Sequence, residues 1–144
     1  MRGTVPMLLL VFLSACSVPM KAPESPSACV RAMSSSARSG DVRAYLDCFG
    51  GELRATLEDA ARTAETEAFA ENIRARMEPV RGMALSEETL ADENTATLRV
   101  EWVFDDRNEV QIFTLLREKG VWRIVEMKEA QYTQPEIPYG TEVF

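Results

Sequence analysis

The chain has 144 residues, of which 46% are hydrophobic and 27% are charged, with 16 Lys and Arg against 23 Asp and Glu and a net charge of -7. This balance predicts one globular domain, and an acidic chain without a basic run argues against nucleic-acid binding. Because there is no histidine, Ser-His-Asp and Cys-His catalysis and imidazole-bound zinc or haem are excluded. We expect no cofactor.

Residues 1–15 are expected to be a leader. Arg2 supplies a positive charge, and residues 5–13 are nearly all apolar, a run too short for a bilayer span of about 20 residues. The end of this segment, Leu13-Ser14-Ala15-Cys16, resembles the lipobox of bacterial lipoproteins. An ordinary cleaved signal peptide is the alternative.

The lipobox resemblance implies that Cys16 carries a diacylglycerol and becomes the first mature residue, so that acyl chains such as palmitate hold the protein on a membrane. Ser17, in place of aspartate, implies the outer membrane facing the periplasm. Residues 16–27 contain Pro19, Pro23 and Pro26 with several serines, which is typical of an extended, flexible tether.

Two helices are predicted after the tether. Ser25 followed by Pro26 indicates a helix start, with the helix running to about residue 37,. Asp41 is expected to cap a second helix, which carries Tyr45 on its apolar face and ends at residues 50–51,.

The cysteines that remain after Cys16 are Cys29 and Cys48. If the two helices pack antiparallel, these side chains lie at nearly the same height. In an exported chain this pair predicts a disulfide. The alternative is two buried free thiols.

The helical pattern continues over residues 52–77, either as one helix or with a break at 63–67,. The pattern then changes to alternation and predicts strands at 81–90, 95–104, 110–117 and 121–127, joined by short turns,. Such strands form an antiparallel meander with one face free for the helices.

This order of elements, with its final Gly120-Val121-Trp122-Arg123-Ile124, resembles the nuclear transport factor 2-like superfamily, also called cystatin-like or ketosteroid isomerase-like. The resemblance covers about residues 28–128 and implies an α+β domain, residues 28–130, with N-terminal helices packed on a curved antiparallel sheet in a cone. Many relatives dimerise through the outer sheet face, but polar side chains there leave monomer and homodimer both open.

The resemblance also implies a pocket at the open end of the cone, where enzymes of the superfamily hold a buried Asp or Tyr. The candidates here are Tyr45 as the phenol and Asp47 or Glu101 as the carboxylate. Because Tyr45 falls on an apolar stripe and Glu101 opposes the face of Trp102, the sequence favours a non-enzymatic protein. An isomerase or hydrolase is the alternative.

Five apolar side chains either fill the core or line a cavity for an apolar small molecule: Trp102, Phe113, Leu115, Trp122 and Ile124,. Arg99 or Arg123 would orient an anionic group of that ligand. Glu101, Glu109 and Glu126 suggest a cation site, but a solvated acidic surface explains them more simply, so we expect no metal.

The tail, residues 131–144, has two prolines and several aromatic and branched side chains. It is expected to be extended, either packing on its own sheet or offering a strand to a partner. Together these features predict a lipid-anchored accessory protein of the cell envelope. It would bind a protein partner or a small ligand, and a carrier of an apolar molecule is a further alternative.

Overall fold

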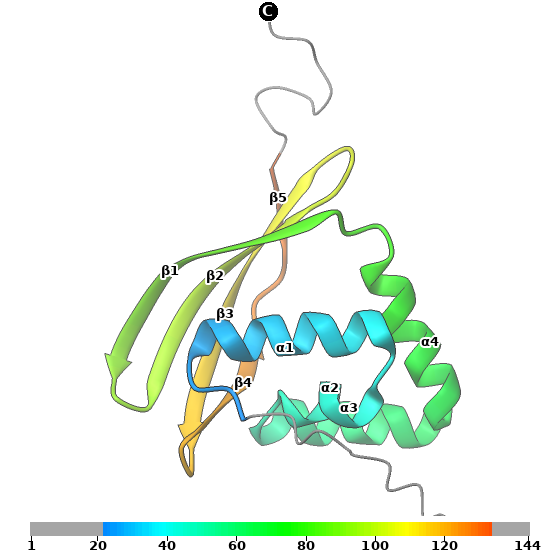
Figure 1. Ribbon diagram of the computed structural model, residues 1–144, viewed down its shortest axis with the longest axis horizontal. Helices are drawn as coiled ribbons and strands as arrows, with labels where there is room; N and C mark the ends of the chain where they lie inside the picture. The colour runs from blue at the N-terminus through cyan, green and yellow to red at the C-terminus, as the bar shows by residue number, and fades with distance from the viewer. Residues whose placement is uncertain (1–21, 134–144) are drawn as a thin grey trace, which may run out of the picture.

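The computed structural model describes residues 22–133. Four helices come first and five strands follow (Figure 1). Their bounds are α1 (Pro26–Ser39), α2 (Val42–Asp47), α3 (Gly51–Ala64), α4 (Thr66–Met77), β1 (Gly82–Asp92), β2 (Thr95–Val103), β3 (Asn108–Glu118), β4 (Val121–Met127) and β5 (Gln131–Thr133). The helices pack on one face of a curved antiparallel sheet, which confirms the expected α+β class and its cone-like arrangement.

The first two helices begin where the capping residues predicted. The Ser25 hydroxyl accepts a hydrogen bond from the backbone N–H of Ala28 at 3.1 Å, and Pro26 occupies the first helical position,. Asp41 accepts in the same way from Ala44 at 3.0 Å and starts α2. Gly40 ends α1 with φ of 71°, a left-handed conformation that glycine adopts without strain,.

The long helical segment is broken at Glu65, whose φ is 66°. An α-helix cannot pass through this conformation, so α3 ends at Ala64 and α4 begins at Thr66. The predicted break at 63–67 is therefore confirmed, and one continuous helix is ruled out. After the bend, α4 passes beside the C-terminal end of α1 (Figure 1), where Arg38 donates to the carbonyl of Val80, just past the end of α4.

The sheet order is β1-β2-β3-β4, with β5 paired to β3 beyond the end of β4. On β2 the buried side chains alternate with partly exposed ones, as the sequence predicted. The first three residues of the predicted tail form β5. The leader, Cys16, Ser17 and residues 134–144 lie outside the described residues, and so do the predictions made for them.

Residues 48–50, between α2 and α3, connect the helices to the sheet through backbone hydrogen bonds to β4. The backbone N–H of Gly50 donates to the carbonyl of Ile124 at 2.9 Å, and the N–H of Ile124 donates to the carbonyl of Cys48 at 2.8 Å. This segment covers the edge of β4 and fixes the end of α2 against it. The largest fully buried side chains gather near it, among them Phe49, Leu115 and Ile124.

The expected disulfide is not formed in the structure, where Cys29 and Cys48 are free thiols. Both are buried in the same part of the core, so the predicted proximity holds. The Cys29 thiol donates to the carbonyl of Cys48 at 3.5 Å, and the Cys48 thiol donates to the carbonyl of Ala44 at 3.3 Å. Each sulfur is thus engaged with a backbone oxygen. The neighbouring Cys48 and burial raise the pKa of Cys29,.

Candidate functional site

A cavity of about 270 Å³ lies between the helices and the sheet, at the end of the sheet where the hairpin joins β2 to β3. We call this end the open end. Most of the cavity wall is apolar, and the exposed side chains of Arg76 and Met127 lie at the cavity rim. The lining residues come from all the layers of the domain: Met33, Ala37, Tyr45, Ile73, Arg76, Met77, Val80, Trp102, Phe104, Glu109, Gln111, Phe113 and Met127.

The pairing of β2 with β3 determines which sheet residues face the cavity. Trp102 pairs with Glu109, Val100 with Gln111, and residue 98 with Phe113. Because paired residues point to the same side of an antiparallel sheet, Glu109 and Gln111 share the inward face with Trp102. Two polar side chains therefore occupy positions that are filled by apolar residues farther along β3.

Both of these polar side chains are held by partners. The Trp102 Nε1–H donates to Gln111 Oε1 at 2.8 Å, and Gln111 Nε2 donates to the carbonyl of Lys128 at 3.2 Å. Glu109 Oε1 accepts from Arg107 Nε at 2.9 Å. The Arg107 guanidinium also lies 4.3 Å from the ring centroid of Phe104, so that arginine is fixed at the rim.

Tyr45 lies across the cavity from the sheet, on α2. Its ring packs edge-to-face on Phe49, with centroids 4.9 Å apart, and on Phe69 at 6.3 Å,. Within the described part of the chain, leaving out the side chains of residues 87 and 88, no group forms a hydrogen bond with its hydroxyl. Burial raises the pKa of Tyr45, and the positive charge of Arg76 opposes that rise,.

The three candidate catalytic residues are not brought together. Tyr45 lines the cavity, whereas Asp47 is exposed and pairs with Arg54 at 3.2 Å. Glu101 lies on the outer face of the sheet, where its carboxylate accepts from Arg99 at 3.0 Å and from Asn108 Nδ2 at 2.8 Å. A phenol and carboxylate pair of the isomerase kind is therefore not assembled from these residues.

The predicted lining set divides between the two ends of the sheet. Trp102 and Phe113 line the cavity. Leu115, Trp122 and Ile124 lie in the core at the other end, toward the hairpin that joins β3 to β4. We call this the closed end.

Neither arginine proposed to orient an anion reaches the cavity. Arg99 belongs to the outer face, paired with Glu101. Arg123 donates to the carbonyl of Asp47, at the C-terminal end of α2.

Sequence reasoning missed Arg76, Gln111, Phe104 and Met127 as parts of the site. For Gln111 there was a usable signal, because it stands in phase with Phe113 and Leu115 in an alternating strand,. Arg76 had none, since its place depends on how α4 packs after the break at Glu65.

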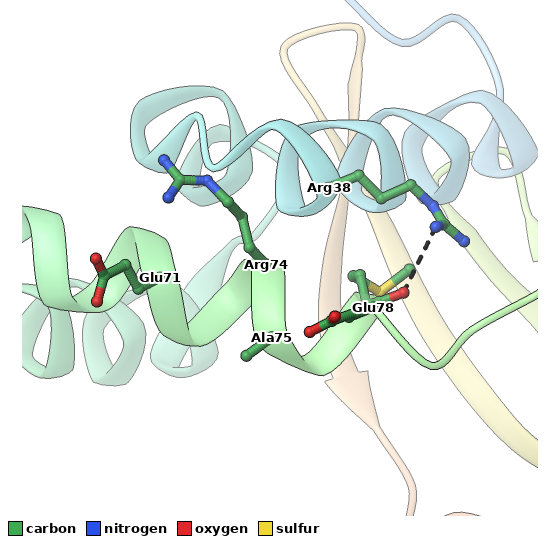
Figure 2. Close-up of a pocket in the computed structure, with 6 residues that line it drawn as sticks. Arg38, Glu71, Arg74, Ala75 and Glu78 are labelled. Carbon is green, nitrogen blue, oxygen red and sulfur yellow. Dashed lines mark hydrogen bonds between the residues drawn. The ribbon is translucent and has the colours of Figure 1, made fainter.

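A second, shallow depression of about 430 Å³ lies on the outside, between α1 and α4 (Figure 2). Its arginines have structural roles. Arg38 donates to the carbonyls of Met77 at 3.5 Å and Val80 at 3.0 Å, and Arg74 donates to the carbonyl of Ser39 at 3.4 Å. Each arginine stands at the C-terminal end of one helix and satisfies carbonyls at the end of the other, so we do not assign a ligand to this surface.

Among the side chains that the structure describes, residues 22–86 and 89–133, no three acidic or cysteine side chains are grouped so that they could hold a metal ion. Glu126 is engaged with Thr114, whose hydroxyl lies 3.1 Å from its carboxylate. In the same range no helix is long and apolar enough to cross a membrane.

The chain matches no protein-family model and no curated protein. Among solved structures it is similar to a chain from Xanthomonas campestris that is provisionally described as a calcium/calmodulin dependent protein kinase II association domain. The two are 11% identical, with a TM-score of 0.42 over 77% of this chain and 86% of that chain. At this level the similarity says nothing about ligand, partner or activity, and the fold class follows from the elements described above.

Proposed function

We propose that this protein is a non-enzymatic binding module of the cell envelope, tethered by a lipid on Cys16. Its α+β domain would take a small, mainly apolar molecule into the cavity at the open end. The cavity carries this proposal, because aromatic walls with a few placed polar groups are typical of small-molecule sites. Its volume of about 270 Å³ lies just below the usual range of about 300 to 1,000 Å³, which favours a small ligand.

The separation of Tyr45 from Asp47 and Glu101 supports binding over isomerase or hydrolase chemistry. General acid–base catalysis needs a proton donor and acceptor within hydrogen-bond reach of one substrate. Glu109 is the carboxylate that lines the cavity, and one of its oxygens, Oε1, accepts a hydrogen bond from Arg107.

Ligand binding is testable with 4-phenylbutan-1-ol as a neutral apolar probe, added to the ¹⁵N-labelled full chain carrying Cys16→Ser. The indole N–H resonance of Trp102 is expected to shift and saturate. That of Trp122, which does not line the cavity, is the internal control. Equal small shifts at both indoles, or none at either, would contradict the proposal.

A variant pair sharpens the same titration. Ala37 is buried and lines the cavity, so Ala37→Phe is expected to fill part of it and abolish the Trp102 shift. Ala75 is exposed on the outside of α4, so Ala75→Phe should leave the shift unchanged. Retained binding in Ala37→Phe, with the fold intact, would place the probe elsewhere.

The tether is tested separately by incorporation of radiolabelled fatty acid in bacteria. The full chain is expected to become labelled, Cys16→Ser to lose the label, and Cys29→Ser to keep it. Labelling that persists in Cys16→Ser would refute lipidation at this position while leaving the cavity proposal intact.

A further inference from the structure

We infer, building on the proposed function, that the cavity prefers a ligand with an anionic group, such as a carboxylate, attached to its apolar body. Arg76 and Tyr45 would bind that group. The polar side chains that line the cavity differ in whether they already have a charged or hydrogen-bonding partner within the protein.

The charged lining residues are Arg76 and Glu109. The Glu109 carboxylate pairs with Arg107 at 2.9 Å, an arginine that also pairs with the exposed Asp106 at 3.0 Å, and only 16% of the Glu109 side chain is exposed. Among the described side chains, those of residues 22–86 and 89–133, none forms an ion pair with Arg76, whose Nε donates to the neutral amide oxygen of Asn72 at 3.3 Å. Of the two charged lining residues, Glu109 therefore has a charged partner within the protein, whereas Arg76 has only the neutral Asn72.

The uncharged polar groups lead to the same ligand class. Gln111 Oε1 already accepts from the indole of Trp102, and Glu109 Oε1 already accepts from Arg107, so both acceptor side chains on the sheet wall are engaged within the protein. The Tyr45 hydroxyl has no partner among the described residues and is able to donate. A ligand group that accepts hydrogen bonds and carries negative charge suits both Tyr45 and Arg76.

The position of this pair supports one shared subsite. Tyr45 and Arg76 line the cavity at the open end. Both also line a smaller neighbouring cavity of about 180 Å³ between α3 and α4, which is distinct from the depression between α1 and α4. They stand where the two spaces meet. An anionic group held there would leave the apolar body of the ligand against Trp102 and Phe113.

The test compares three probes of the same size, 4-phenylbutanoate, 4-phenylbutan-1-ol and 4-phenylbutylamine, through the Trp102 indole shift of the full chain carrying Cys16→Ser. We expect the acid to bind about tenfold or more tightly than the alcohol, the range of a charge-assisted hydrogen bond. The amine is expected to bind most weakly.

Arg76→Gln is expected to remove the preference for the acid while the alcohol still binds, and Arg76→Lys to keep most of it. Arg62→Gln changes the net charge equally at an exposed site outside both cavities and should keep the full preference. Tyr45→Phe is expected to weaken the acid more than the alcohol.

The outcomes separate the two proposals. If the alcohol or the amine binds as tightly as the acid, or if Arg76→Gln keeps the preference, the anion subsite is wrong and the binding function stands. If none of the three probes shifts Trp102, the proposed function fails as well.

Discussion

The two ends of the sheet are built from the same strands and the same alternation, yet they differ in what occupies the inward positions. At the closed end Leu115 and Ile124 are fully buried and pack beside Phe49. At the open end the inward positions of β3 hold Glu109 and Gln111, and the space in front of them is a cavity.

One fold thus provides a stable core at one end of the sheet and a site at the other. At the closed end Phe49, Leu115 and Ile124 are fully buried together, and the close packing of such side chains is costly to disturb. The polar side chains of the open end need partners, which come from Trp102 and Arg107. With these partners the polar side chains stay in fixed positions, where they border the cavity without filling it. We expect substitutions at the closed end to affect stability and those at the open end to affect binding.

The largest expected effect is on stability at the closed end. Ile124→Ala removes a fully buried side chain and should lower the free energy of unfolding by about 2 to 5 kcal/mol. Met127→Ala, at the rim and 36% exposed, should cost roughly 1 kcal/mol or less. Urea unfolding followed by circular dichroism measures both. Equal costs would contradict the contrast between the ends.

The next largest effect on the free energy of unfolding is expected from the hydrogen bond between Gln111 and Trp102 at the open end. Gln111→Leu leaves the Trp102 indole N–H without its acceptor, which should cost about 1 to 3 kcal/mol in the same unfolding measurement. Gln111→Glu also loses the donor to the Lys128 carbonyl but keeps an acceptor for the indole, so it is the control for the indole hydrogen bond and should cost less. A stabilised Gln111→Leu variant would show that the hydrogen bond does not hold this wall.

Much of the fold could be predicted from the sequence, because its signals are local. The caps at Ser25 and Asp41, the change of period after residue 80 and the turn at Gly120 each depend on a few adjacent residues. The break at Glu65 was one of two open alternatives, since neighbouring residues alone do not determine whether a helix continues.

The site could be predicted only in part. Alternation correctly indicated that Trp102 and Phe113 face the helices, but it does not say which inward side chains fill the core and which border a cavity. Spacing correctly brought Cys29 and Cys48 together, yet it carries no information on the direction of the thiols, which donate to carbonyls. The lipid on Cys16 and the location in the envelope stay predictions.

A pH effect of smaller size is expected from Tyr45. Burial raises the pKa of this phenol above its ordinary value of 10.0, so the folded protein holds the proton more tightly than the unfolded chain does. The resulting stability is complete below about pH 10 and is lost as the pH rises through the folded pKa.

Urea unfolding between about pH 8 and pH 11 should therefore show a decline that is less steep in Tyr45→Phe. The same slope in both chains would mean that Tyr45 is not shielded from water.

The smallest effect is expected on the outer face. Glu101→Gln weakens the partly exposed pair with Arg99 but keeps an acceptor for Asn108, so stability should change by no more than about 1 kcal/mol,. The Trp102 shift with 4-phenylbutanoate should be unchanged. A lost shift would mean that Glu101 acts on the cavity after all.

A crystal structure of the chain grown with 4-phenylbutanoate would show whether the open end binds an apolar anion. Density for the probe is predicted in the cavity at the open end, with its ring against Trp102 and its carboxylate at Arg76, while the packing around Ile124 stays unchanged. A cavity closed by rearranged side chains, or probe density only outside it, would contradict the claim.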